Sequence, residues 1–241
     1  MTKTSQFAYK KVKYALTELL RQNKWIHSQA IPSEPLLARR YQVSVGTIRR
    51  AINELVAENI LIREQGRGTF VVSHTTDYML NVFFRIESHE GARGLPNSKL
   101  ISFETVNSTK LVAKALALKT REQVYKIRTL LSYKNLPAIV DEIYLSVKLF
   151  PGLDESFFEN RVGTLYGLFQ RVYGITVVKA HETVEAIPPE EYFSNILKMD
   201  SQQPLLCVRR VSYAYKGIPV DLRIRYIHSG KYRYFNNLGG G

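Results

Sequence analysis

The chain has 241 residues, of which 45% are hydrophobic and 23% are charged, and its formal net charge is +13. This length allows one large domain or two small ones. The sequence contains neither an apolar run of about 18 residues nor an N-terminal signal-peptide core, so we expect a cytoplasmic protein without a membrane span.

The positive charge is concentrated in the N-terminal part of the chain. Residues 1–73 contain 12 lysines and arginines against 5 acidic residues, so 7 of the 13 net positive charges lie in under a third of the sequence. Such a basic segment is typical of phosphate binding, which depends steeply on salt concentration. A generally basic protein would explain the total charge but not this concentration.

The first predicted element is an amphipathic helix over residues 7–27. Its buried side would carry Tyr9, Val12, Ala15, Leu16, Leu19 and Leu20. A second helix is predicted to begin at Ser33, a favourable N-cap, because Pro35 in the first turn loses no hydrogen bond there. These two helices would form part of a small three-helix core.

A third helix is predicted to follow Ser44, which can cap it. The buried positions of the second and third helices are Leu37, Tyr41, Ile48, Ile52, Leu55 and Val56. The exposed face of the third helix carries Gly46, Thr47, Arg49, Arg50 and Asn53. Small residues let a helix approach base edges closely, and arginines bind guanine edges or phosphates, so this helix is predicted to read the DNA major groove.

A hairpin with glycines at its tip is predicted next. The short apolar runs 60–62 and 69–72 flank a loop that contains Gly66, Arg67 and Gly68. Glycine tolerates a positive φ, and the negative potential of a narrow minor groove attracts arginine. An ordinary surface hairpin with a solvated arginine is the alternative, but the position directly after two helices favours a DNA-binding wing.

Residues 7–73 resemble the DNA-binding domain of the GntR family of bacterial transcription regulators. The resemblance rests on Pro32-Ser33-Glu34, Val43-Ser44, Thr47-Ile48-Arg49 and the run from Gln65 to Val71, in the family's order and spacing. It implies that operator DNA is contacted by Ser33, Ser44, Gly46, Thr47, Arg49 and Arg50 from the helices, and by Gly66 and Arg67 from the wing. Pro35 and Val45 occupy positions where the family usually has arginine, so two customary contacts are missing.

Beyond residue 78 the pattern changes to alternating strands with a few helices. Strands are predicted at 124–131, 138–145, 176–187, 205–215 and 219–227, and helices at 111–118, 164–173 and 190–197. Lys134-Asn135 and Lys216-Gly217 are predicted hairpin turns. The predicted fold class is therefore α+β: a winged helix-turn-helix domain (1–73), a linker (74–83) and an antiparallel sheet domain with helices (84–241).

The second domain, over residues 84–237, is similar to the UTRA ligand-sensing domain, which places the chain in the HutC subfamily. The residues that carry the similarity include Arg93-Gly94, Leu136-Pro137, Tyr144-Leu145, Phe150 to Leu153, Thr164 to Tyr166, Tyr173 to Ile175, Arg210 to Tyr213 and Tyr232 to Tyr234. The resemblance implies a fold like that of chorismate lyase, used for binding rather than chemistry. It also implies a homodimer formed largely through this domain.

The same resemblance implies an effector pocket. Glu142 matches the family's acidic pocket residue, and Thr164 matches a hydroxyl at the start of a helix, where an anion would also meet free N–H groups. Ile86, Glu87, Ser88 and His89 match the loop that closes over the ligand. The alternatives are that Glu142 is a solvated strand residue and that Thr164 is only a helix cap.

One departure from the family's sequence pattern bears on the class of effector. Members that sense sugar phosphates often carry two arginines on the strand 124–131, and the matching positions here are Thr129 and Leu131. Arg128 is one residue out of phase, so its side chain is expected on the opposite face. A neutral sugar or another small molecule therefore fits at least as well. Arg223 and Arg225 share a strand face and could bind an anion or pair with acidic residues on a neighbouring strand.

The sequence thus predicts a ligand-responsive transcription regulator, most often a repressor in this family. Its partners would be double-stranded operator DNA, a second copy of the chain and a small metabolite, expected to be a sugar or sugar derivative. An enzyme with a lyase-like domain and a structural nucleoid-type DNA binder are the other readings. The five histidines lack metal-ligand spacing, and Cys207 lies in an apolar stretch that suits a buried, inert thiol. We therefore predict no enzyme activity, no metal and no cofactor.

Overall fold

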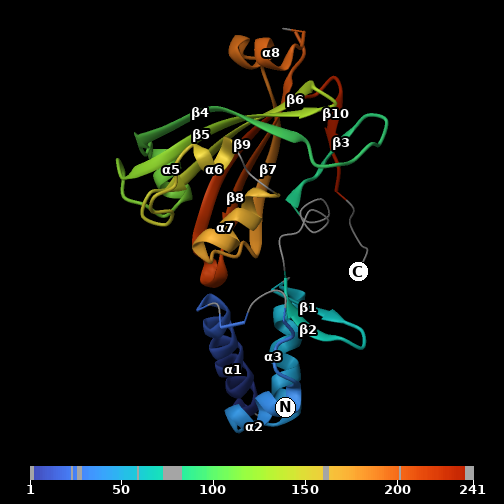
Figure 1. Ribbon diagram of the computed structural model, residues 1–241, viewed down its shortest axis with the longest axis vertical. Coiled ribbons are helices and arrows are strands. Elements are labelled where there is room, and N and C mark those ends of the chain that lie inside the picture. The colour runs from blue at the N-terminus through green and yellow to red at the C-terminus, as the bar shows by residue number, and fades with distance from the viewer. Residues whose placement is uncertain are drawn as a thin grey trace.

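The computed structural model shows a small helical domain joined to a larger sheet domain (Figure 1). It describes residues 3–22, 24–25, 29–58, 60–72, 83–159, 163–200 and 202–236. The predicted linker, 74–83, lies outside these residues except for Phe83. Phe83 is 3% exposed and packs in the core of the sheet domain, so it belongs to that domain rather than to a linker.

Three helices form the first domain: α1 (Lys3–Arg21), α2 (Glu34–Tyr41) and α3 (Val45–Ala57). The first helix ends at Arg21, short of the predicted residue 27; residues 26–28 lie outside the described part of the chain. The core between the helices contains Val12, Leu16, Leu20, Ile31, Leu37, Ala38, Ile48, Ala51, Ile52 and Leu55. The apolar periodicity predicted most of this core, but it missed Ile31, Ala38 and Ala51, and the predicted Tyr41 and Val56 are only partly buried.

The turn between α2 and α3 depends on local chemistry. Gln42 ends α2 in the left-handed conformation, with φ 53°. The Ser44 side chain accepts a hydrogen bond from the Thr47 N–H at 3.2 Å, as an N-cap should. Ser33 occupies the N-cap of α2, but its side chain makes no capping hydrogen bond. Pro35 in the first turn has no N–H to donate, which removes one possible partner.

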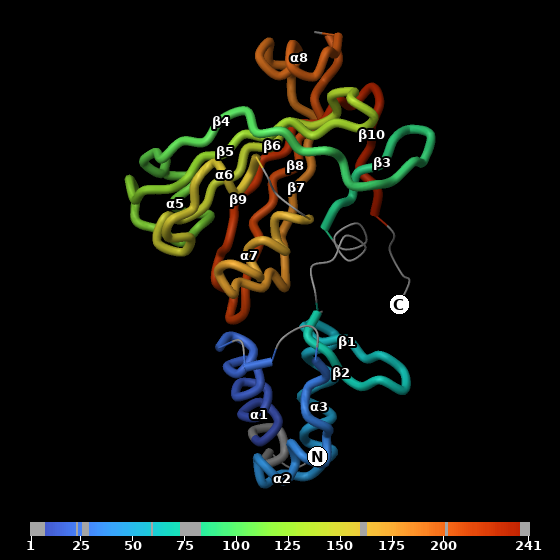
Figure 2. Tube along the Cα trace, viewed as in Figure 1, coloured from blue at the N-terminus to red at the C-terminus, as the bar shows by residue number. Residues whose placement is uncertain are grey.

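The wing is an antiparallel hairpin of β1 (Leu61–Glu64) and β2 (Gly68–Val71). Figure 2 shows it projecting to the side of α3. Gly66 and Gly68 have φ angles of 73° and 123°, a region that side chains with a Cβ rarely adopt. The Ile31 N–H donates to the Thr69 carbonyl at 2.8 Å, which attaches the wing to the chain before α2.

The second domain contains a six-stranded antiparallel sheet in the order β4-β5-β6-β9-β8-β7. Its strands are β4 (Asn97–Asn107), β5 (Gln123–Tyr133), β6 (Leu136–Ser146), β7 (Lys179–Ile187), β8 (Leu205–Tyr213) and β9 (Pro219–His228). A separate pair joins β3 (Ile86–Ser88) to β10 (Tyr232–Tyr234). The helices are α5 (Lys110–Ala115), α6 (Ser156–Glu159), α7 (Leu165–Tyr173) and α8 (Glu191–Leu197), with the 3-10 turn η2 (Tyr215–Gly217) between β8 and β9.

The two faces of the large sheet are covered by different helices. Helices α6 and α7 pack on the face that carries Ile127 and Ile143, which we call the α7 face. Helices α5 and α8 pack on the other, the α8 face, against groups that include Val124 and Val140. Because side chains alternate along each strand, this assignment gives the face on which a polar residue lies, except beyond the register shifts near Leu100, Leu131 and Ser212.

Candidate DNA-reading surface and effector site

The N-terminal end of α3 presents the predicted reading residues to solvent. Arg49 has a side chain that is 60% exposed. A Cβ added at Gly46 would meet only Ser44 Oγ, at 3.8 Å, so this part of the helix is open. The Thr47 hydroxyl lies 2.9 Å from Ser44 Oγ. Gly46, Thr47 and Arg49 therefore lie together on one accessible surface.

Arg50 lies apart from this group. Its guanidinium carbon is 4.0 Å from the centroid of the Tyr9 ring on α1. Successive helix residues point about 100° apart, so Arg49 and Arg50 leave α3 in different directions. Arg50 thus packs against α1, and its contact with DNA stays a prediction.

The arginine predicted at the wing tip, Arg67, is exposed to solvent. The Arg67 side chain is 72% exposed, forms an ion pair with Glu64 and lies 5.5 Å from the centroid of the Phe70 ring. Apart from Gly66 itself and its two chain neighbours, no atom of the described residues lies within 4 Å of a Cβ built at Gly66. A charged, unobstructed tip of this kind suits a groove of DNA.

Two residues of this surface were not predicted, Glu34 and Arg63. The Arg49 Nε donates to Glu34 Oε2 at 2.9 Å, and the Arg63 Nη2 donates to Glu34 Oε1 at 3.0 Å. Arg63 also donates to Asn53 Oδ1 at 2.8 Å. The only sequence signal was the Pro32-Ser33-Glu34 motif, in which the glutamate had no assigned role.

A buried group of charges lies on the α7 face of the sheet. It consists of Arg210, Arg223 and Arg225 with Asp141, Glu182 and Asp221, and we call it the arginine cluster. Asp141 is 1% exposed, and Arg225 donates to its two oxygens at 2.7 and 2.8 Å. Burial alone would raise the pKa of Asp141, but the charge and hydrogen bonds of Arg225, together with the charges of Arg223 and Arg210, outweigh burial and lower it.

Arg223 is less well paired than its neighbour. It is 8% exposed, and its closest carboxylate oxygens, on Asp141 and Asp221, are each 3.5 Å away. Within the described residues its Nε and Nη2 have no hydrogen-bond partner. Buried donors without acceptors are costly and rare, so a ligand that brings oxygen atoms would satisfy them.

Arg210 extends the cluster towards Glu182 and Phe83. Its Nε donates to Glu182 Oε1 at 2.6 Å, and one terminal nitrogen donates to the Phe83 carbonyl. The Tyr234 hydroxyl donates to Glu182 at 2.7 Å. Burial alone would raise the pKa of Glu182, but the charge of Arg210 and the bond from Tyr234 together lower it. Arg210 and Glu182 therefore carry opposite charges at neutral pH.

Glu142 lies on the other side of the sheet from the arginine cluster. It is 6% exposed and accepts from Arg128 Nε at 2.5 Å on the α8 face. It is therefore not a solvated strand residue, and it cannot line one pocket with Arg223 and Arg225. Arg128 points away from the face of Thr129 and Leu131, as the strand period predicts.

Two other predicted pocket features differ from expectation. Residues 86–88 form a strand paired with β10 rather than a loop, because Ile86 packs into a core cluster and Glu87 pairs with Arg233 at 2.8 Å. His89 is exposed, and Ser88 Oγ accepts from the Ala92 N–H. Thr164 caps α7, accepting from the Gly167 N–H at 3.0 Å, which is the role that the helix-cap alternative gave it.

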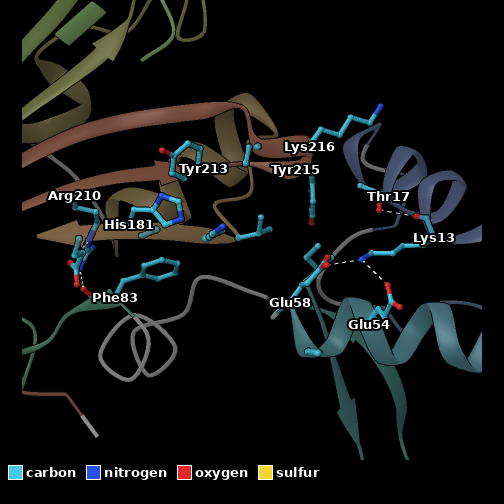
Figure 3. Close-up of a pocket in the computed structure, with 18 of the residues that line it drawn as sticks. Lys13, Thr17, Glu54, Glu58, Phe83, His181, Arg210, Tyr213, Tyr215 and Lys216 are labelled. Atoms are coloured by element: carbon cyan, nitrogen blue, oxygen red, sulfur yellow. Dashed lines mark hydrogen bonds and ion pairs between the residues drawn. The ribbon is translucent and has the colours of Figure 1, made fainter. Parts of the chain in front are cut away.

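A cavity of about 1090 Å³ lies between the two domains. Figure 3 shows Lys13, Glu54 and Glu58 of the helical domain on one side, and Phe83, His181 and Arg210 of the sheet domain on the other. Lys13 Nζ lies 3.0 Å from Glu54 and 2.6 Å from Glu58. One end of the cavity thus reaches the arginine cluster, and the other reaches α1 and α3.

The tip of the β8–β9 hairpin also joins the domains (Figure 1). Tyr215 is 4% exposed and packs in the core of the helical domain. Lys216 Nζ lies 2.5 Å from Glu18 Oε2 and donates to the Tyr14 hydroxyl at 3.1 Å. The two strands that form this hairpin are the ones that carry Arg210 and Arg223.

Comparison with known proteins identifies both domains. The family described as "UTRA domain" matches residues 92–233, and the one described as "Bacterial regulatory proteins, gntR family" matches residues 8–71. The chain belongs to the GntR family and carries a UTRA domain. Family and relatives are transcription regulators, so this GntR protein is a ligand-responsive transcription regulator and not an enzyme.

Its relatives include named repressors. The chain is 27% identical over 188 residues to the HTH-type transcriptional repressor NagR of Bacillus subtilis, covering 78% of this chain and 76% of NagR. It is 27% identical over 218 residues to the "Probable fructoselysine utilization operon transcriptional repressor" of Escherichia coli, covering 90% and 88%. The mannosyl-D-glycerate transport/metabolism system repressor MngR of E. coli is 23% identical over 217 residues, covering 90% and 87%.

Solved structures agree with the fold. The ligand-binding domain of a GntR-family regulator from Bordetella bronchiseptica superposes with a TM-score of 0.60 and 28% identity, covering 64% of this chain and 96% of that one. PhnF from Mycobacterium smegmatis covers 95% of this chain and 99% of its own, with a TM-score of 0.54 and 20% identity, which supports the fold alone. No helix in the described part of this chain is long and apolar enough to cross a membrane.

Proposed function

We propose that this GntR-family regulator is a repressor that binds operator DNA as a homodimer and responds to a small metabolite, a sugar or sugar derivative. The proposed DNA-binding surface comprises Gly46, Thr47 and Arg49 of α3 and Arg67 at the tip of the wing. The observation that carries the proposal is the cavity lined by residues of both domains. A ligand bound there would favour one arrangement of the domains and so change how two DNA-binding domains match their half-sites.

We place the effector at the end of the cavity where Arg210 and Glu182 lie, with Arg223 behind them. Buried guanidinium and carboxylate groups together suit a ligand that both donates and accepts hydrogen bonds, as a sugar does. Thr129, 3% exposed, and Leu131, 6% exposed, occupy the strand positions expected for a phosphate clamp. The names of the relatives, which refer to fructoselysine and mannosyl-D-glycerate, support the same class.

A thermal-shift screen of the full chain against sugars, sugar phosphates, amino acids and organic acids tests the effector. A ligand that raises the unfolding temperature should also change the affinity for the promoter DNA upstream of this gene, because both effects report the same coupling. Arg223→Met should lose the thermal shift. A sensor, unlike an enzyme, should leave the ligand chemically unchanged after incubation. Light scattering measures the molar mass in solution and so tests for the dimer. A ligand that binds but leaves DNA affinity unaltered contradicts the proposal.

A further inference from the structure

Glu34 joins three elements of the DNA-reading surface. It is the first residue of α2, and its two carboxylate oxygens each hold one arginine: Arg49 of α3 at 2.9 Å and Arg63 of β1 at 3.0 Å. The Glu34 side chain is only 17% exposed, whereas those of Arg49 and Arg63 are 60% and 45% exposed. The carboxylate therefore lies beneath the surface that the two arginines present.

A carboxylate in this position opposes DNA binding in general. It neutralises one of two arginines on the surface that approaches the phosphates, and each phosphate contact contributes to non-specific affinity. Affinity for phosphates alone therefore does not account for an acidic residue here, and its benefit lies in the contacts that it makes.

That benefit is the orientation of Arg49. Arg49 binds Glu34 through Nε, and its two terminal nitrogens have no hydrogen bond within the described residues. Those terminal nitrogens, with their fixed fork of donors, are the atoms that recognise the edge of guanine. Holding Nε reduces the number of rotamers that Arg49 can adopt before it meets a base, which favours one contact over many.

Arg63, the second arginine held by Glu34, extends the influence of Glu34 to the wing. Arg63 lies on β1 and bridges Glu34 to Asn53 of α3, with a 2.8 Å bond to Asn53 Oδ1. The wing tip at Gly66 and Arg67 follows within four residues on the same hairpin. Glu34 and Arg63 thus connect the wing to the recognition helix.

We propose that Glu34 is a positioning residue that determines operator specificity: it orients Arg49 and ties the wing to α3 through Arg63, which lowers affinity for DNA in general and raises discrimination between sequences. This inference rests on the proposed operator binding. It predicts a result that a purely structural role does not, namely that affinity and specificity change in opposite directions.

The test uses the full chain in three forms: wild type, Glu34→Gln and Glu122→Gln. Glutamine keeps the shape of the side chain but replaces one of the two acceptor oxygens by an NH2 donor, so it cannot hold both arginines in the present geometry. Glu122→Gln removes the same negative charge in the sheet domain, where Glu122 pairs with Lys148. Sequences are selected from randomised duplex DNA by wild type, and each protein is then titrated with the selected and with a scrambled duplex.

For Glu34→Gln we expect tighter binding to scrambled DNA, and a ratio of selected to scrambled affinity that falls by about tenfold or more. Glu122→Gln should keep the wild-type ratio. Arg63→Met, which leaves the pair of Glu34 and Arg49 intact, should lose discrimination only at the positions next to the wing. An unchanged ratio in Glu34→Gln overturns the positioning role while leaving operator binding intact. A wild type that selects no sequence overturns both.

Discussion

Lys216 of the sheet domain lies 2.5 Å from Glu18 of α1, so an ion pair attaches the tip of the β8–β9 hairpin to the DNA-binding domain. The Lys216 side chain also packs 4.4 Å from the centroid of the Tyr14 ring. Because β8 and β9 carry Arg210 and Arg223, the hairpin gives the candidate effector site a direct connection to α1.

Replacing Lys216 by methionine should loosen this contact. We expect faster hydrogen exchange at the hairpin amides and at the end of α1, because the ion pair and the bond to Tyr14 are both lost. Lys134→Met is a matched control, since Lys134 also stands at an exposed hairpin tip with positive φ, 48° against 61° for Lys216. Equal exchange in the two variants would show that the ion pair does not hold the domains together.

The same contact should depend on pH. Hydrogen bonds from Arg21 and then from Lys216 lower the pKa of Glu18 to about 2, from the ordinary glutamate value of 4.5. A carboxylate whose folded pKa is lowered contributes stability above its unfolded pKa and loses it as pH falls towards the folded value. The interdomain contact should therefore persist at pH 5 and weaken between pH 4.5 and 2. An NMR titration of the Glu18 carboxylate checks this, and a midpoint near 4.5 would contradict it.

The two arginines of β9 should differ in their effect on stability. Arg225→Met leaves Asp141 buried without its closest partner and should lower the free energy of unfolding by about 3–5 kcal/mol. Arg223→Met should lower it by about 1 kcal/mol or less, because Arg223 makes only 3.5 Å contacts with carboxylates. Urea unfolding of both variants measures the difference. A similar large loss for both would show that Arg223 is a structural ion pair rather than part of a binding site.

The sequence predicted the helical domain more completely than the effector site, because the helical domain depends on contacts between residues close together in the sequence. Ser44, Gly46 and Gly66 act through neighbours within four residues, so local chemistry identified them. Whether Asp141 or Glu142 faces the arginines depends on the pairing of β6 with β9, across more than 80 residues. The sequence favoured Glu142, but the register pairs Asp141 with Arg225.

Strand β4 was not predicted from the sequence, because a bulge between Leu100 and Ser102 interrupts the alternation of its side chains.

Gly46→Ala should separate folding from DNA binding. The added Cβ would meet only Ser44 Oγ at 3.8 Å, an ordinary contact, and alanine favours a helix over glycine by about 0.5–1 kcal/mol. The variant should therefore be as stable as wild type or more so. Its operator affinity should fall, because the methyl group holds the helix away from the bases. Fluorescence anisotropy with operator DNA, beside a thermal melt, checks both; unchanged affinity would show that Gly46 does not approach DNA closely.

Operator binding by Arg49→Ala is the most direct test of the DNA-reading surface, with Arg50→Ala as the charge-matched control. Arg50 rests on the Tyr9 ring, whereas Arg49 presents its terminal nitrogens to solvent. Loss of an arginine that contacts a base should cost about 1–3 kcal/mol, roughly a 10- to 100-fold drop in affinity for the selected duplex. We expect that drop in Arg49→Ala and a smaller one in Arg50→Ala. Unchanged specific binding by Arg49→Ala would contradict the assignment of α3 as the recognition helix.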